Sequence, residues 1–237
     1  MNIACLMPTY GRSPELLNNS LACFKAQNYT DKMLIILDDL GTLQGSDLET
    51  DDKVGIYSTQ RRRSSMGDKY NVLCDIAERN EADAILVWDD DDVYLEDYIT
   101  SHAAILHENP WSKPDTIITA YTNPPSRESA LGRFHGTVGA RLDFLKEVNY
   151  WEDTRRGTFD QEFIAKLEKN CKPGIPSYTP QYVYRWGTTQ SLHSSGRIHE
   201  EAYYLYKPQY VEPIKLIKPE YDADTIRIRD YIQANSL

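Results

Sequence analysis

The sequence places four aspartates in a row at residues 89–92, directly after the apolar run AILVW. Adjacent carboxylates repel one another, so a solvated turn, or capping of a following helix by Asp90 or Asp92, is the simplest explanation. The apolar run instead favours a buried strand whose end carries the acidic side chains. Because side chains leaving a strand alternate in direction, Asp89 and Asp91 could converge on a hard cation such as Mg²⁺ or Mn²⁺. Such a cation would neutralise the charge that develops on a departing diphosphate.

Two other apolar runs also end in polar residues. The first, at residues 2–7, leads into the turn PTYGR, and the second, at residues 32–37, is followed by Asp38 and Asp39. In parallel sheets, ligands bind beyond the carboxyl ends of the strands. We therefore expect the three polar groups to lie together and to form a ligand site.

The elements that must position these groups alternate along the first hundred residues. Apolar runs predict strands at 2–7, 32–37, 54–59 and 84–88, and helical spacing predicts helices at 13–27, 67–80 and 93–107. Ser13 is suited to cap the first helix, and Pro14 to its first turn. This alternation predicts a mainly parallel sheet covered on both faces.

The alternation ends after about residue 115. The patterns there predict strands at 116–121 and 181–186, an irregular strand leading into a helix over 132–148, and a helix at 159–170. A proline-spaced tail begins at residue 207 and contains a predicted helix around 224–233.

Composition restricts the class of protein. The 237 residues carry a formal charge of −10, from 36 acidic and 26 basic residues, which disfavours nucleic acid as a partner. The basic run Arg61–Arg62–Arg63 is too short to reverse this. The four cysteines show no metal-site spacing and are expected to be free thiols. With no apolar stretch of the ~20 residues that span a bilayer, and no signal-peptide pattern, we expect a cytoplasmic protein without a transmembrane segment.

Two blocks of the sequence resemble the inverting nucleotide-sugar glycosyltransferases of family two, which have the GT-A fold. The blocks are CLMPTYGRSPELLNNSLACFKAQNYTDKMLIILDD and GDKYNVLCDIAERNEADAILVWDDDDVYLEDYI. They cover roughly the first hundred residues and contain three motifs in the family's order, whereas the remaining chain matches only loosely.

The resemblance implies an α/β fold, a Rossmann-like three-layer sandwich with a mainly parallel central sheet. It implies a GT-A domain over residues 1–206, with a nucleotide-sugar-binding half at 1–110 and an acceptor half at 111–206, followed by the tail at 207–237. The implied reaction transfers a sugar from a nucleoside diphosphate sugar, with a UDP-sugar favoured, to a hydroxyl of a glycan or another acceptor.

The resemblance also implies roles for individual residues. It places nucleotide-sugar binding at Pro8, Thr9, Tyr10, Arg12, Asp38, Asp39, Gly67, Lys69, Asp89 and Asp90. It places Mn²⁺ or Mg²⁺ on Asp89 and Asp91. His193 is the candidate third ligand of the metal, with His135 and His199 as alternatives.

Inversion requires a general base that deprotonates the acceptor hydroxyl. The resemblance implies Asp160, at the start of the helix predicted over 159–170, although Phe159 stands where the family often has an acidic residue. Glu152 and Asp153 form a competing site. The alternative role for Asp160 is to cap its helix.

Three other functions remain open at the level of sequence. A sugar nucleotidyltransferase would share the layered fold, but the glycine-rich phosphate loop usual near the N-terminus of those enzymes is absent from this sequence. A non-catalytic nucleotide-sugar-binding module would bind donor without turnover. Transfer to modified DNA bases is opposed by the acidic charge.

Overall fold

The computed structural model describes residues 1–48, 52–120, 124–176, 179–185, 207–235 and 237. Its main sheet has six strands in the order β4-β2-β1-β5-β10-β7. Their bounds are β1 Ile3–Thr9, β2 Lys32–Asp38, β4 Val54–Ser58, β5 Ala84–Val87, β7 Trp111–Ser112 and β10 Gly139–Arg141. The first four strands of this order are parallel, and β10 pairs antiparallel with both β5 and β7. The mainly parallel sheet expected from the sequence is therefore confirmed.

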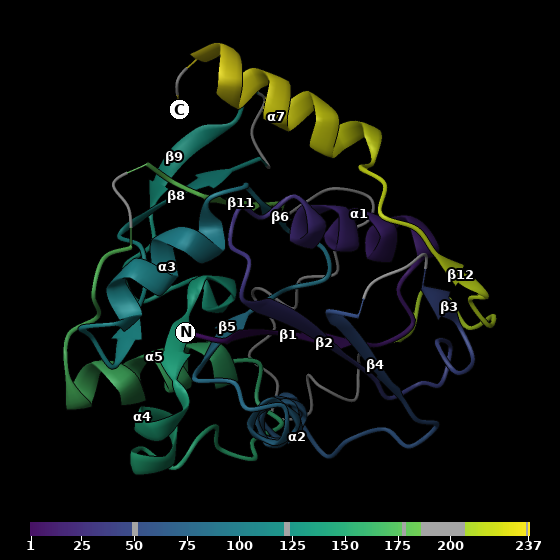
Figure 1. Cartoon of the computed structure of the whole chain (residues 1–237), viewed down its shortest axis with the longest axis horizontal. Helices are drawn as coiled ribbons and strands as arrows, with labels where there is room; N and C mark the ends of the chain where they lie inside the picture. Colours follow the sequence, from purple (N-terminus) through teal and green to yellow (C-terminus); the bar gives the residue numbers. More distant parts are fainter. Residues whose placement is uncertain (49–51, 121–123, 177–178, 186–206, 236) are drawn as a thin grey trace.

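Helices cover both faces of this sheet (Figure 1). One face carries α1 (Pro14–Lys25) and α3 (Tyr98–Leu106), and the other carries α2 (Met66–Arg79), α4 (Leu142–Glu147) and α5 (Phe159–Asn170). Strand β1 contributes to both interfaces, because its alternate side chains enter two separate hydrophobic clusters and are all inaccessible to solvent. The chain is thus a three-layer α/β sandwich.

Serine caps define where the first two helices begin. The Ser13 side chain accepts a hydrogen bond from the backbone of Leu16, and Pro14 opens α1. Ser65 accepts one from the backbone of Asp68, 3.0 Å away, at the start of α2. Capping satisfies amides that have no partner within the helix, so it favours helix starts at these two serines.

The prediction of a single helix over 93–107 is wrong at its first end. Val93 and Tyr94 form β6, which pairs antiparallel with β11 (Tyr182–Tyr184), and α3 begins only at Tyr98. The side chain of Asp92 accepts hydrogen bonds from the Tyr182 hydroxyl and from the backbone of Arg185. These long-range bonds hold residues 92–94 alongside β11, so the chain forms a strand here although its apolar spacing is that of a helix.

Strand β11 belongs to a second sheet of four strands in the order β6-β11-β8-β9. Strand β8 (Thr116–Thr119) is parallel to β11, and β9 (Ser126–Ser129) is antiparallel to β8. Strands are confirmed within the expected ranges 116–121 and 181–186, but they are shorter, at Thr116–Thr119 and Tyr182–Tyr184. Tyr121 and Trp186 lie outside the described residues. The irregular strand leading into a helix that was expected over 132–148 is confirmed as β10 followed by α4. The short helix η1 (His135–Thr137), which precedes them, was not predicted.

The tail packs against the body of the molecule. Strand β12 (Leu216–Ile217) pairs parallel with β3 (Asp47–Leu48), and α7 (Ala223–Asn235) lies on the side of the sheet that carries α1 (Figure 1). The helix predicted around 224–233 is confirmed, and it buries Ile228 and Ile232 in the same cluster as α1. Among the described residues, every helix falls short of the length or apolar character needed to cross a bilayer.

Candidate functional site

The polar ends of β1, β2 and β5 meet at one edge of the main sheet, because these three parallel strands are neighbours. Arg12, in the turn after β1, joins two of the ends. Its Nε lies 2.9 Å from Asp90 Oδ1, and one terminal nitrogen lies 2.9 Å from Asp91 Oδ2. Pro8 and Thr9 are buried as the last residues of β1. The structure therefore brings the first turn and the acidic run together.

Lys69 joins the third strand end to this group. Its Nζ lies 2.6 Å from Asp39 Oδ1 and donates a hydrogen bond of 3.2 Å to the carbonyl of Thr9. Both charged side chains are at most 2% exposed. Burial lowers the pKa of Lys69, and the adjacent Asp39 carboxylate opposes that shift. Helix α2 thus supplies the cation that fixes the end of β2 against the end of β1.

The adjacent carboxylates Asp38 and Asp39 have different surroundings. Asp38 is inaccessible and accepts hydrogen bonds from the backbones of Leu40 and Leu43 and from the Ser58 hydroxyl, at 3.0, 2.8 and 2.8 Å. These bonds shape the loop after β2. A contact between Asp38 and a nucleotide stays a prediction, whereas Asp39 lies within the cluster of strand ends.

The basic run contributes to this edge, although its shortness gave it no role in the sequence analysis. The Arg62 guanidinium lies 4.3 Å from the centre of the Tyr10 ring, and Lys69 Nζ lies 5.3 Å from the same centre. The backbone amide of Arg63 donates a 2.9 Å hydrogen bond to Asp39. The signal in the sequence that could have placed these arginines at the site is their position between β4 and the helix that carries Lys69.

The four aspartates of the acidic run play different parts. Asp92 is inaccessible and holds β11 through its two hydrogen bonds, whereas Asp90 and Asp91 are buried against Arg12. Asp89 keeps partial exposure. Its pKa is raised well above the ordinary value by burial and by the charges of the three neighbouring carboxylates. Tyr10 and Asp89 are thus partly exposed beside Asp90, Asp91 and Lys69, which are buried.

The residues of the acidic run suit a hard cation. Their carboxylate oxygens are the ligands that Mg²⁺ and Mn²⁺ prefer, and two of the carboxylates, Asp90 and Asp91, form ion pairs with Arg12. Within the described part of the chain, no group of three or more His, Cys, Asp or Glu side chains is already arranged to hold a metal. A metal on Asp91 would compete with its ion pair to Arg12.

Of the three histidines considered as the third metal ligand, the structure describes His135. His135 Nε2 accepts a 2.9 Å hydrogen bond from the indole of Trp151, and the imidazole is packed among the rings of Tyr70, Phe159 and Phe163. Burial lowers the pKa of His135 to about 3. These contacts give His135 a structural role. His193 and His199 lie outside the described residues, so the third metal ligand stays a prediction.

Asp160 lies in the first turn of α5, after the N-cap residue Thr158, and its carboxylate accepts a 2.8 Å hydrogen bond from the backbone of Gln161. Burial raises its pKa. The charges of Asp89, Asp90 and Asp160 all raise the pKa of Tyr70, after burial itself. Asp160 and the acidic run thus act electrostatically on the same tyrosine, whereas the role of Asp160 as a base stays a prediction.

The competing carboxylates hold a loop in place. Glu152 forms a 2.9 Å ion pair with Lys166, and Asp153 accepts hydrogen bonds from the hydroxyls of Ser64 and Ser65 at 3.1 and 2.6 Å. The carbonyl of Glu152 lies so close to Gly67 that a Cβ there would overlap it. Gly67 thus permits close packing between this loop and α2, and its predicted contact with the nucleotide remains untested.

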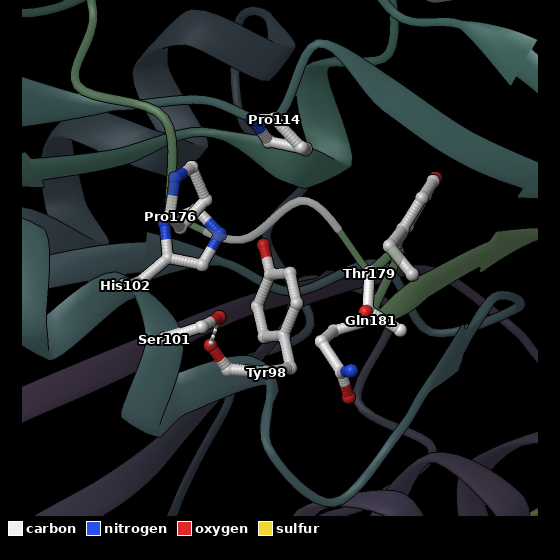
Figure 2. A pocket seen from close by; sticks show the side chains of 8 residues that line it. Tyr98, Ser101, His102, Pro114, Pro176, Thr179 and Gln181 are labelled. Carbon is white, nitrogen blue, oxygen red and sulfur yellow. Dashed lines mark hydrogen bonds between the residues drawn. The ribbon is translucent and has the colours of Figure 1, made fainter.

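A separate small crevice lies between α3 and the segment that leads into β11. Figure 2 shows its lining by Tyr98, Ser101, His102, Pro114, Pro176, Thr179 and Gln181, and Tyr182 completes it. The imidazole Nδ1 of His102 lies 2.7 Å from the Ser112 hydroxyl, and burial lowers the pKa of His102 to about 3. None of the residues predicted to bind donor or metal lines this crevice.

The fold is that of the GT-A glycosyltransferases. Among solved structures, residues 1–349 of S. aureus TarS in complex with UDP-GlcNAc match with a TM-score of 0.59 and 18% identity, over 86% of this chain and 64% of that one. The same part of TarS with UDP matches with a TM-score of 0.54 and 19% identity, over 78% and 60%. The chain therefore spans less than two thirds of these structures. No family model matches this chain, and no curated protein sequence matches it.

Proposed function

We propose that the chain is an inverting glycosyltransferase that takes a sugar from a nucleoside diphosphate sugar, with UDP-sugars favoured, and transfers it to an acceptor hydroxyl. The observation that carries this proposal is the cluster in which Arg12 and Lys69 join the polar ends of β1, β2 and β5 within a GT-A fold. The structures of TarS with UDP and UDP-GlcNAc support this class of donor.

In this proposal the donor lies across the three strand ends. Tyr10 offers a partly exposed ring for the base, and Asp39 a carboxylate that accepts hydrogen bonds. Arg12 supplies a guanidinium, whose planar set of donors suits phosphate oxygens. Asp89 and Asp91 would hold Mg²⁺ or Mn²⁺, which when bound would neutralise charge on the diphosphate.

Asp160 is the proposed general base. A carboxylate can accept the proton of the acceptor hydroxyl only when it is ionised, and a raised pKa makes it a stronger base at neutral pH. Glu152 and Asp153 are less suited, because both are exposed and engaged in holding their loop.

Calorimetry with a panel of nucleoside diphosphates, each with and without Mn²⁺, tests donor binding. We expect UDP to bind in the presence of Mn²⁺ and Asp91→Ala to abolish that binding. Asp143→Ala is the matched control, since Asp143 is an exposed carboxylate that pairs with Arg141 at the start of α4. Equal binding by parent and Asp91→Ala would contradict the assignment of the metal site.

Turnover distinguishes the proposal from its alternatives. A transferase releases a nucleoside diphosphate from the sugar donor when an acceptor is present. A nucleotidyltransferase would instead release pyrophosphate from a nucleoside triphosphate and a sugar phosphate, and a binding module would release neither. Release of pyrophosphate alone would overturn the proposed reaction.

A further inference from the structure

A buried arginine directly after β11, Arg185, forms hydrogen bonds with two residues of the acidic run. The guanidinium Nε of Arg185 donates a 2.7 Å hydrogen bond to the backbone carbonyl of Asp91. The backbone amide of Arg185 donates a 2.9 Å hydrogen bond to the side chain of Asp92. One residue, itself 1% exposed, therefore fixes two successive positions of the run.

The partner of Arg185 comes from the C-terminal tail. A carboxylate oxygen of Asp222, just before α7, lies 2.7 Å from a terminal nitrogen of the guanidinium. The other oxygen accepts a 2.7 Å hydrogen bond from the backbone of Thr225, whose hydroxyl lies 3.2 Å from the same guanidinium nitrogen. The amide of Asp222 is bound in turn by the side chain of Asn19 on α1, at 3.2 Å. Asp222 is thus itself held in a defined position.

The geometry of a guanidinium transmits this position to the acidic run. Its donors lie in one rigid plane, so the terminal nitrogen held by Asp222 fixes the direction in which Nε points. Without the Asp222 carboxylate, the buried guanidinium would lose the ion pair that holds this nitrogen, and it would have to reorient or become hydrated. In either case the hydrogen bond to the Asp91 carbonyl would weaken.

We propose that Asp222 is a positioning residue that acts through Arg185 to hold the backbone of the acidic run, and with it the Asp91 carboxylate, in the arrangement that binds donor. The role in donor binding rests on the proposed function. The role in holding the run does not, and it can be measured without any ligand.

Amide hydrogen exchange over residues 88–95 is the direct test, in the full chain without ligand. Asp222→Asn keeps the shape of the side chain but removes its charge, and we expect faster exchange in that segment. Glu96→Gln is the matched control, because it removes the ion pair between Arg229 of α7 and the body of the protein without touching Arg185. Unchanged exchange in Asp222→Asn, or the same increase in both variants, would overturn the proposal.

Donor affinity supplies the second measurement. Partners that orient metal ligands typically contribute about 10- to 100-fold in affinity, so Asp222→Asn should weaken binding of UDP with Mn²⁺ by about that factor. Asp222→Glu should recover part of the loss, and Glu96→Gln should bind as the parent does. A change in exchange with unaltered UDP affinity would overturn the role in donor binding. If the parent itself binds no UDP, the proposed function fails, and the exchange result still decides whether Asp222 positions the run.

Discussion

Replacing Lys69 with methionine should destabilise the protein strongly, because the buried carboxylate of Asp39 would then lose its ion pair with Lys69. The two charged atoms are 2.6 Å apart, and the two side chains are only 2% and 0% exposed. Removing one partner of a buried ion pair costs about 3–5 kcal/mol. For a domain of this size, each kcal/mol shifts the midpoint of thermal unfolding by about 2–4 °C. The expected decrease in Tm is therefore between about 6 and 20 °C.

Thermal unfolding followed by circular dichroism measures this shift. Lys146→Met is the matched control, since Lys146 is 56% exposed where it pairs with Glu78, and exposed pairs contribute at most about 1 kcal/mol. The double variant Lys69→Met/Asp39→Leu removes both charges and should recover much of the loss. Our reasoning is refuted if Lys69→Met lowers Tm no more than Lys146→Met does.

Three further predictions concern the base, the turn after β1 and the buried histidines. Asp160→Asn should lower kcat about 10²- to 10⁴-fold while leaving UDP affinity unchanged. The activity of the parent should fall as pH decreases through the pKa of Asp160, which burial raises above the ordinary 3.8, and a pH–rate profile that lacks this acid limb would contradict the role. Gly11→Ala should lower the free energy of unfolding by about 1–3 kcal/mol, because Gly11 has φ +60° and a Cβ there would lie 2.6 Å from the carbonyl of Tyr210. Limited proteolysis should then cut the tail of this variant faster than that of the parent. Burial lowers the pKa of His102 and His135 from 6.5 to about 3, so between these pH values the unfolded chain binds more protons than the folded one, and stability decreases as pH falls below 6.5. Urea unfolding should show that the free energy of unfolding decreases by about 2 kcal/mol per histidine between pH 7 and pH 5. The total decrease should be smaller in His102→Gln.

Local patterns predicted the elements that carry the site, because the information for them lies within a few residues. Ser13 and apolar residues at helical spacing were sufficient to predict α1, and helical spacing alone was sufficient for α2, whose cap Ser65 only the structure shows. The three polar strand ends could be placed at one edge because parallel strands in a layered sandwich leave few other arrangements.

The parts that the sequence did not reveal depend on contacts between distant residues. Val93 and Tyr94 pair with β11, some ninety positions further along, and no local pattern encodes that choice. The partner of Arg185 is 37 residues away in the tail. Asp38 and Asp39 cannot be told apart by sequence pattern, because they are adjacent and of the same type. The path of the loop after β2 gives them different surroundings.

Strand β10 determines whether the two predicted halves of the chain can exist separately. It comes from residues after 110, yet it hydrogen-bonds to β5, which ends in the acidic run. A fragment that stopped at residue 110 would leave β5 with one row of backbone amides and carbonyls unpaired. Such an open sheet edge recruits strands from other molecules. Residues 1–110 expressed alone should therefore aggregate, and a different second half could be grafted onto them only if the graft supplied an antiparallel strand in the same register.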